Sequence, residues 1–448
     1  MTAAEMIAAF SVRFDPATLS PELRRLCARS LLDTYAVGVA GRSEPATLRA
    51  RSYLATLGAG EQAALWGQEE RAPVESAALY NGIAAHVLDY DDVTSPLRGH
   101  PSVVLWPALL ALGECEGLPM RRLMSAYVVG FEVICKLARV IAVEHYARGW
   151  HATASIGVIG AAAACAHLLS LTATQTAHAV GLAVAQAAGT RANFGADAKS
   201  FQAGQANAAA VRAARLAQAG FTASPDSMGN AQGYSVLYGQ GQDLAPALEC
   251  LGETPFELIA GGIDVKKYPL CYATHRTLDA LLALRADHGL TLERVDRVEI
   301  ETSPGALVPL IHHRPATGLQ GKFSMEYAVA AALADGRINL ASFTDEQVRR
   351  PRIQAFLPSV HAECASGAGI LPRWASVRIH ERGGACHVRR VEDLRGSSAL
   401  PLSDQELMDK AADCYAWARM RADVPKQFSL AGEPDAAVAD FLALVRPA

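Results

Sequence analysis

The sequence predicts a mainly α-helical protein, built from one large all-helical domain and one smaller α+β domain. Three observations lead to this fold class. Long apolar segments with few glycines or prolines occupy most of the chain up to about residue 265. Period-two alternation of apolar and polar residues, typical of half-exposed strands, begins only after that point. The length of 448 residues also favours two domains, because a single core rarely grows this large.

Residues 1–265 are expected to form the large helical domain. Thr172 and Gln175 have the capping-box spacing, which marks a helix start before His178. Gly220 stands where a glycine commonly ends a helix. Six further segments are apolar and long enough to be helices: 23–40, 75–88, 104–113, 122–143, 155–169 and 206–218.

Residues 266–394 are expected to form the smaller α+β domain. The alternating segments 298–302 and 377–380 predict two strands, and a third short strand is expected near 387–391. Two helices should lie between the first two strands. One begins near Ser324 and the other at the capping-box sequence that starts with Thr344.

Residues 395–448 return to helical sequence. A third capping box, from Ser403 to Glu406, marks the start of this segment. Its pattern alone leaves open whether it packs against the first domain.

Composition excludes several classes of partner and cofactor. A net charge of −4 does not indicate the basic surface expected of a nucleic-acid-binding protein. The sequence contains no apolar run of about 18 residues, so a membrane span is not predicted. The N-terminal segment lacks the basic start of a signal peptide, so we expect a cytoplasmic protein. Nine cysteines form no C-x-x-C pair, which argues against structural zinc, an iron–sulfur cluster and a disulfide framework.

One short segment is unusually dense in titratable residues. Three carboxylates, Asp89, Asp91 and Asp92, lie close to two imidazoles, His86 and His100, in otherwise apolar sequence. Packing does not explain this density, because each buried charge is costly unless it is paired. A functional site is the favoured interpretation, and a solvated turn is the alternative. A calcium loop is disfavoured, because the glycine and the distal glutamate of an EF-hand are missing.

Two histidines precede helices in similar contexts. His100 stands before Pro101, and His151 follows Gly149 and Trp150. A lone histidine in either place is more often structural, but the two together support a site as well as a structural role.

Lysine is rare in this chain, which makes its positions informative. Only seven of the 41 basic residues are lysines, so arginine fills most surface positions. Lys199 precedes a predicted helix, while Lys266 and Lys267 stand at the expected domain junction, near Cys271 and His275. A lysine is a compact point charge whose pKa responds to burial. The clusters therefore predict recognition of a multiply charged anion, although each lysine alone could be a surface charge.

The motifs of several common enzyme classes are missing. The sequence contains no Walker A motif, no G-x-G-x-x-G after a strand, no H-E-x-x-H and no G-x-S-x-G.

A set of short motifs follows in order along the chain: 81–92, 100–102, 149–151, Lys199 with Gly204, 220–222, 266–271 with His275, 314–318, 322–324, Tyr327 and 401–403. This ordered set resembles the MmgE/PrpD family over essentially the whole chain. Members of this family include 2-methylcitrate dehydratase, cis-aconitate decarboxylase and iminodisuccinate epimerase. The resemblance implies a large helical domain built from both chain ends, a smaller α+β domain, a homodimer, and no metal or organic cofactor.

The resemblance also implies a pocket between the domains and assigns residues to it. The matching positions are Asp89, His100, His151, Lys199, Lys266 and Tyr327. Two positions depart from the decarboxylase type, which carries Thr where this chain has Val93 and His where it has Cys271. Cys271 is similar to the dehydratase type, whereas the sequence Arg98-Gly99-His100 is more similar to the epimerase type.

We expect a cofactor-independent lyase that eliminates water or CO₂ from a small di- or tricarboxylate. His100 and His151 would transfer protons, with Tyr327 as an accessory acid and Asp89 orienting one imidazole. The substrate carboxylates would be bound by Lys199 and Lys266, together with the two nearby residues Cys271 and His275. Asp91 and Asp92 are expected to do no more than shape the turn. An epimerase is the first alternative, and a non-catalytic carboxylate-binding protein is the second.

Overall fold

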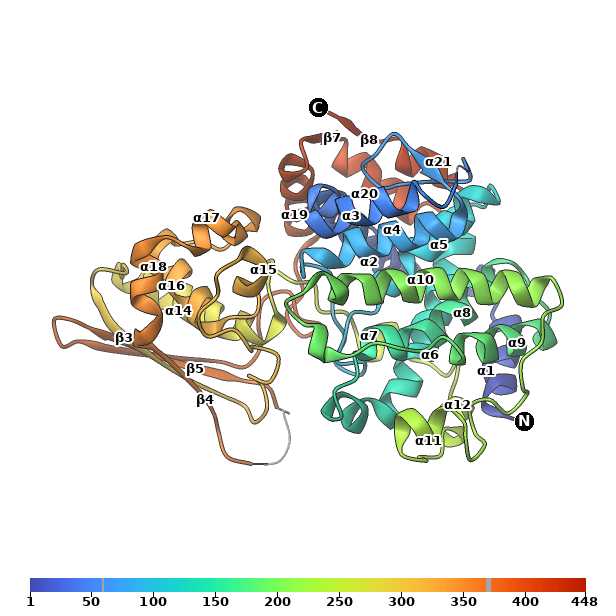
Figure 1. Cartoon of the computed structure of the whole chain (residues 1–448), viewed down its shortest axis with the longest axis horizontal. Helices are drawn as coiled ribbons and strands as arrows, with labels where there is room; N and C mark the ends of the chain where they lie inside the picture. Colours follow the sequence, from blue (N-terminus) through green and yellow to red (C-terminus); the bar gives the residue numbers. More distant parts are fainter. Residues whose placement is uncertain (59, 368–371) are drawn as a thin grey trace.

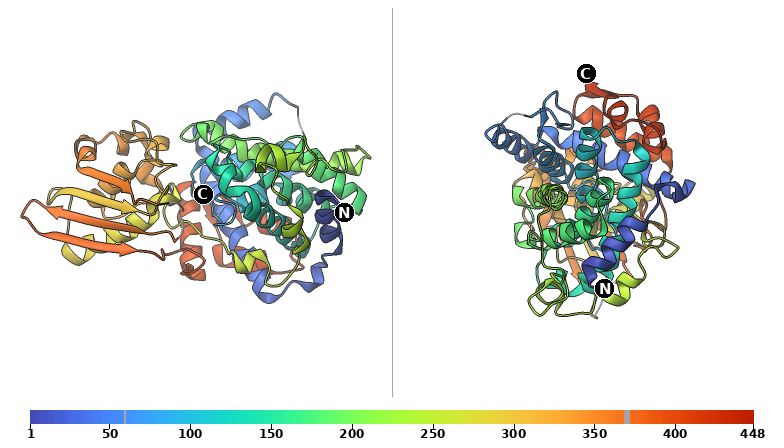
Figure 2. Two further views of the ribbon diagram at one scale, coloured as in Figure 1. Left: turned by 90° about the horizontal axis from the view of Figure 1, so that it is seen from below. Right: turned by 90° about the vertical axis from the view of Figure 1, so that its right-hand side faces the viewer.

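The computed structural model describes residues 1–58, 60–367 and 372–448. A large helical domain carries both termini, and a smaller α+β domain projects from one end of it (Figures 1 and 2). The fold class predicted from the sequence is confirmed. In the part of the chain that is described, no helix combines the length and the apolar character needed to cross a bilayer.

The large domain is a layered assembly of helices around one core. The two helices that matter most for the site, α4 and α10, pack along each other. Their contact is close because it is made by glycines: a Cβ on Gly204 would lie 2.5 Å from the carbonyl oxygen of Leu79. The helices are α1 (Ala3–Arg13), α2 (Pro21–Ala40), α3 (Pro45–Leu54), α4 (Val74–Val87), α5 (Trp106–Cys115), α6 (Met120–Ala147), α7 (Ala152–Ser155), α8 (Gly157–Leu168), α9 (Ala173–Val184), α10 (Asp197–Gln218), α11 (Tyr234–Gly239), α12 (Ala245–Glu249) and α13 (Glu257–Ala260).

The C-terminal segment packs back onto the large domain. Helix α19 (Asp404–Trp417) lies against α2, as does α20 (Val424–Gly432), and α21 (Val438–Leu442) contacts α5. A buried ion pair joins Lys410 of α19 to Asp33 of α2 at 2.6 Å. The same ammonium group donates to the carbonyl oxygen of Tyr90 at 3.0 Å, so the C-terminal segment also supports the loop that follows α4. The pattern of residues 395–448 had left this connection open.

The small domain consists of a four-stranded sheet with helices on one face (Figure 1). The strand order is β4-β3-β5-β6, with β3 and β4 parallel and the other pairs antiparallel. Helices α14 and α16 cover one face, which explains why apolar residues alternate along β3 and β5. The elements are α14 (His275–His288), β3 (Val295–Thr302), α15 (Gly318–Gly321), α16 (Met325–Asp335), α17 (Asp345–Val348), α18 (Pro351–Phe356), β4 (Val360–Cys364), β5 (Ala375–Glu381) and β6 (Cys386–Val391).

The elements predicted from the sequence are present, with three informative differences. Both capping boxes at Thr172 and Ser403 are formed, and Thr344 caps α17. Helix α10 begins at Asp197 rather than near residue 206, which places Lys199 in its first turn. Strand β4 and helix α14 were not predicted. Strand β4 lies at the edge of the sheet with only its first residue buried, so it lacks a clear apolar alternation.

Candidate functional site

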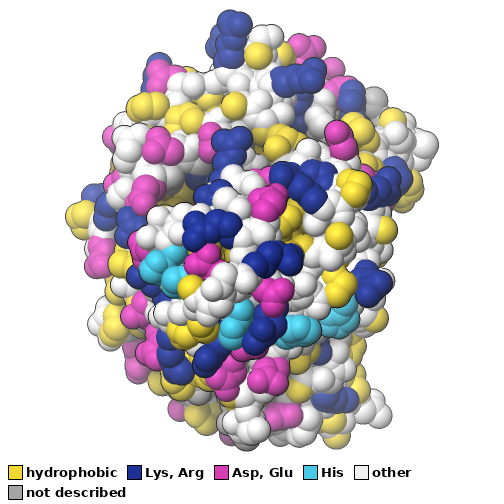
Figure 3. Space-filling model, turned by 90° about the vertical axis from the view of Figure 1, so that its left-hand side faces the viewer, with side chains coloured by type: hydrophobic (Ala, Val, Ile, Leu, Met, Phe, Trp, Pro, Cys, Tyr) yellow, Lys and Arg dark blue, Asp and Glu magenta, His cyan; other side chains and the backbone are white. Residues whose placement is uncertain are grey.

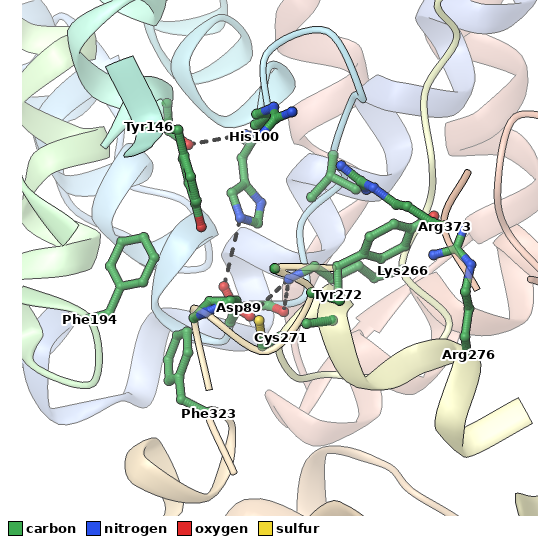
Figure 4. Close-up of a pocket in the computed structure, with 18 of the residues that line it drawn as sticks. Asp89, His100, Tyr146, Phe194, Lys266, Cys271, Tyr272, Arg276, Phe323 and Arg373 are labelled. Carbon is green, nitrogen blue, oxygen red and sulfur yellow. Dashed lines mark hydrogen bonds and ion pairs between the residues drawn. The ribbon is translucent and has the colours of Figure 1, made fainter. Parts of the chain in front are cut away.

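A pocket lies between the two domains, and residues from both line it (Figure 4). The large domain contributes the loop that follows α4, the start of α7 and the start of α10. The small domain contributes the segment before α14, the end of β3 and the start of β5. Its lining residues are Asp89, Val93, Thr94, Arg98, Gly99, His100, Tyr146, His151, Thr153, Phe194, Lys199, Lys266, Cys271, Tyr272, Ala273, Arg276, Thr302, Ser303, Gly305, Ala306, Pro309, Phe323, Arg373, Trp374 and Ala375.

The floor of the pocket is the C-terminal end of α4, where the chain turns sharply. Asp89 adopts φ = 51°, a left-handed conformation that is uncommon for residues other than glycine. Two lysines bind the carbonyl oxygens exposed at this helix end. Lys322 donates to Leu88, and Lys266 donates to the carbonyl oxygen of Asp89 at 2.7 Å. Cations at a helix C-terminus are favourable, so these lysines offset the cost of placing carboxylates there.

Asp89 forms a buried ion-pair cluster with two lysines from distant segments. Lys199 of α10 donates to Oδ1, and Lys266 lies 2.9 Å from Oδ2. All three side chains are almost fully buried. Burial alone would raise the pKa of the Asp89 carboxyl, but the two ammonium groups outweigh it and hold the pKa below its usual value. The cluster carries one positive charge in excess, so a substrate carboxylate would be attracted to it.

Asp91 lies between two imidazoles. Its Oδ2 is 2.8 Å from Nδ1 of His86 and 3.0 Å from Nδ1 of His100, and both histidine rings are buried. Nδ1 of His86 is hydrogen-bonded to this oxygen, whereas Nδ1 of His100 lies at ion-pair distance but is not aligned for a hydrogen bond. A proton on Nδ1 of His100 would still face the negative charge of Asp91, which favours that tautomer. The other nitrogen, Nε2, is then a free base, 3.8 Å from Asp89 Oδ1. Burial lowers the pKa of His100, although Asp91 opposes this effect, so the imidazole is neutral near pH 7.

His151 presents a second neutral imidazole to the pocket. Its Nδ1 is 2.7 Å from Oε1 of Gln202, while the amide nitrogen of Gln202 donates to the carbonyl oxygen of Thr190. This arrangement favours the proton on Nδ1 and leaves Nε2 free, and Nε2 has no partner among the described residues. Burial, followed by the neighbouring His86, lowers the pKa of His151 well below its usual value. Both His100 and His151 can therefore act as general bases without first losing a proton.

Within the described ranges, only the side chains of His86, Asp91 and His100 place ligand atoms close enough together for a metal ion. Nδ1 of His86 is hydrogen-bonded to Oδ2 of Asp91, whereas Nδ1 of His100 lies 3.0 Å from the same oxygen without a hydrogen bond.

Six of the eight residues predicted for the site line the pocket: Asp89, His100, His151, Lys199, Lys266 and Cys271. Burial, followed by the charge of Asp89, raises the pKa of the Cys271 thiol to about 11, so it lines the pocket as a neutral group.

The structure does not bring Tyr327 or His275 into the pocket, which corrects their expected roles. Tyr327 is 0 % exposed, and its hydroxyl donates to the carbonyl oxygen of Ser342 inside the small domain. His275 is equally buried, with Nε2 3.2 Å from the carbonyl oxygen of Leu270. Both side chains point into the core of the small domain because they begin helices whose buried faces pack there.

The expected roles of the aspartates are also corrected. Asp91, rather than Asp89, contacts His100 at hydrogen-bond distance, whereas Asp89 binds the lysines. Asp92 accepts hydrogen bonds from both the hydroxyl and the amide of Ser102. Only Asp92 has the structural role that had been expected for both later aspartates.

Several residues in or next to the pocket had no assigned role in the sequence interpretation. His86 does not line the pocket but is hydrogen-bonded to Asp91 next to it, and only its place in the acidic segment could have indicated it. Arg98, Arg276 and Arg373 come from three distant segments of an arginine-rich chain, so nothing in the sequence distinguishes them.

The fold and the site together define a two-domain, mainly helical protein. Its pocket lies at the domain interface and combines positively charged side chains with histidines suited to acid–base chemistry. The MmgE/PrpD N-terminal domain matches residues 5–247 and the MmgE/PrpD C-terminal domain matches residues 268–425. The chain therefore belongs to the MmgE/PrpD family, as the motif resemblance had indicated.

Characterised relatives of this chain are cis-aconitate decarboxylases. The protein from Mus musculus is 27% identical over 409 residues, which cover 88% of this chain and 82% of the relative. The protein from Homo sapiens is 26% identical, with 85% and 81% covered. A cis-aconitate decarboxylase from Aspergillus terreus is 25% identical, with 75% and 73% covered.

Proposed function

We propose that this protein is a lyase that acts on a small tricarboxylate, at a carbon next to one of its carboxylates. One observation carries the proposal: two neutral imidazoles with free Nε2 atoms lie in the same pocket as the Asp89–Lys199–Lys266 cluster. A weakly acidic C–H bond needs both a base and stabilisation of the charge that develops on the adjacent carboxylate. The pocket offers both.

Charge stabilisation and proton transfer would be carried out by different side chains. Lys199 and Lys266 would bind the reacting carboxylate and stabilise negative charge as it develops. In a dehydration, one imidazole would take the proton from carbon on its Nε2, and the imidazolium so formed would give that proton to the leaving hydroxyl, which departs as water. In a decarboxylation, the carbon–carbon bond electrons remain on carbon as CO₂ departs, and that carbon would take a proton from an imidazole that has first been protonated from solvent. Asp91 would hold His100 in its reactive tautomer in both reactions.

The choice between the two eliminations rests on evidence of different kinds. The cis-aconitate decarboxylase relatives support a carboxy-lyase. Cys271 and Val93 line the pocket where decarboxylase-type members carry His and Thr, which supports a hydro-lyase of the 2-methylcitrate dehydratase type.

Direct assay separates these eliminations. We would incubate the purified protein with cis-aconitate and with 2-methylcitrate, and follow CO₂ release and ultraviolet absorbance of a new or lost C=C bond. Release of CO₂ from cis-aconitate identifies a carboxy-lyase, whereas alkene formation from 2-methylcitrate identifies a hydro-lyase. If neither acid is consumed, the lyase proposal fails for these two tricarboxylates.

An epimerase of an iminodisuccinate-like dicarboxylate is a second candidate. It is favoured by the presence of two imidazoles in one pocket, because a neutral one could remove a proton from one face while the other, protonated from solvent, gives a proton to the opposite face. Incorporation of solvent deuterium at the α-carbon without any alkene or CO₂ would support it.

A further inference from the structure

Three arginines gather on the small-domain side of the pocket. Arg98 comes from the loop after α4, Arg276 from the first turn of α14, and Arg373 from the segment before β5. Figure 4 shows Arg276 and Arg373 on one side of the pocket, with Asp89 and His100 between them and the aromatic side chains of Phe194 and Phe323. Close approach of these like charges is unfavourable unless an anion joins them.

No carboxylate pairs with these arginines among the residues that the structure describes. Arg276 donates only to a backbone carbonyl oxygen, and neither Arg98 nor Arg373 forms a side-chain hydrogen bond there. The Nε atom of Arg373 is buried without a partner. The hydroxyl of Ser303, which also lines the pocket, is likewise buried and without a partner, and Ser303 is 1% exposed. Unpaired buried donors are costly, so they indicate a ligand that accepts from them.

The arginines on the outside of the same domain behave differently. Figure 3 shows basic and acidic side chains interspersed on its outer end. Arg294 pairs with Glu381 at 2.7 Å, and Arg389 with Asp287 at 3.3 Å. Many surface arginines of this domain therefore pair with carboxylates within the protein, and those without such a partner, such as Arg314 and Arg337, are exposed to water. The pocket arginines differ, because they lack a carboxylate partner and are only partly exposed.

We propose that Arg98, Arg276 and Arg373, with Ser303, form a second anion subsite that binds the distal carboxylates of the substrate. The inference rests on the proposed function for the inner subsite, where Lys199 and Lys266 would hold the reacting carboxylate. Arginine suits the outer position, because its planar guanidinium binds a carboxylate with two parallel hydrogen bonds. The ligand class is then a tricarboxylate, with one anionic group at the inner end and the remaining two at the outer end. The subsite also joins the two domains, because Arg98 belongs to one and Arg276 to the other.

Binding of unreactive acids tests the subsite without relying on turnover. Tricarballylate is a saturated tricarboxylate, and glutarate has the same five-carbon chain without the third carboxylate. We would measure the Kd of both by isothermal titration calorimetry for the wild type and for Arg276→Ala and Arg373→Ala. Each variant should weaken tricarballylate by about 10- to 100-fold, because a hydrogen bond to a charged group contributes about 1.5–3 kcal/mol. The preference for tricarballylate over glutarate should shrink in both variants.

Control variants separate local recognition from general charge. Arg378→Ala removes an exposed arginine of β5 that lies 3.6 Å from Glu299, and it should leave both Kd values unchanged. Arg373→Lys keeps the charge but not the bidentate geometry, so its loss should be intermediate. Thermal unfolding would verify that each variant is folded.

The possible results lead to distinct conclusions. A preference for tricarballylate that is unchanged in Arg276→Ala and Arg373→Ala would overturn the subsite, and so would a wild type that does not bind tricarballylate. Wild-type binding without turnover of any tricarboxylate would instead contradict only the lyase proposal.

Discussion

The two domains contribute differently to the same pocket. The large domain, together with Lys266 at the domain junction, supplies a preorganised set of charges: Asp89 is bound by Lys199 and Lys266, and Asp91 contacts His100. These groups are buried and have partners within the protein. The small domain supplies Arg276, Arg373 and Ser303, which have no carboxylate partner among the described residues.

This difference separates reaction chemistry from recognition. Proton transfer needs groups that are held rigidly in one protonation state, and burial among fixed partners provides this. Recognition of an anion needs hydrogen-bond donors that are not already paired within the protein. We infer that changes in the large-domain half should act mainly on kcat, and changes in the small-domain half mainly on binding. Four predictions test this comparison.

The largest expected effect is the loss of a proton-transfer group. His151→Gln should lower kcat by about 10²- to 10⁴-fold, the usual contribution of general acid–base catalysis. Gln can keep a polar contact to Gln202 but cannot accept a proton from carbon. Steady-state kinetics on whichever of cis-aconitate and 2-methylcitrate the protein consumes would measure this, with His313→Asn, at an exposed histidine, as the control. An unchanged kcat would remove His151 from the mechanism.

The next effect concerns the buried ion cluster. Asp89→Asn should destabilise the protein by about 3–5 kcal/mol, because removing the carboxylate leaves the two buried ammonium groups of Lys199 and Lys266 without a counterion. Asp89→Asn combined with Lys199→Met should recover part of this free energy of unfolding but not the activity. Denaturant unfolding monitored by circular dichroism would measure both variants. A double variant no more stable than Asp89→Asn would show that the cost is not electrostatic.

Removal of the imidazole orienter should have a smaller effect. Asp91→Asn should lower kcat by about 10- to 100-fold, because His100 loses the partner that favours its reactive tautomer. The Asp91 charge raises the pKa of His100 against the stronger effect of burial, so its removal should lower that pKa further. Activity of a neutral base is lost as pH falls through its pKa. The acidic limb of the kcat/KM profile should therefore move to lower pH, and an unmoved limb would assign Asp91 a structural role only.

The smallest expected effect distinguishes the pocket from its surroundings. Tyr327→Phe should leave kcat within about threefold of the wild type, because the tyrosine hydroxyl lies in the small-domain core and not in the pocket. It should cost about 1–3 kcal/mol of stability, since the carbonyl oxygen of Ser342 loses its donor. Kinetics and thermal unfolding of the same preparation would check both parts. A loss of activity without a loss of stability would return Tyr327 to the mechanism as an acid.

Helix content and the positions of the main strands were predictable from the sequence, because apolar periodicity and capping residues are local signals. The density of charge around Asp89 and His100 and the rarity of lysine were equally local, and they indicated Asp89, His100, Lys199 and Lys266, which all line the pocket. Tyr327 was carried over from family resemblance, and a motif match does not reveal which way a side chain points.

The partners of these residues were decided only by the tertiary structure. Helices α4 and α10 approach closely at Gly204, and this contact brings Lys199 to Asp89 across more than one hundred residues of sequence. The packing of α14 and of the segment before β5 brings Arg276 and Arg373 to the same pocket wall. The sequence determined by itself which side chains are available and which segments are helical or extended. The pairing of charged side chains depends on long-range packing. Electrostatic interaction energy depends on the distance between two charges in space and not on their separation along the chain.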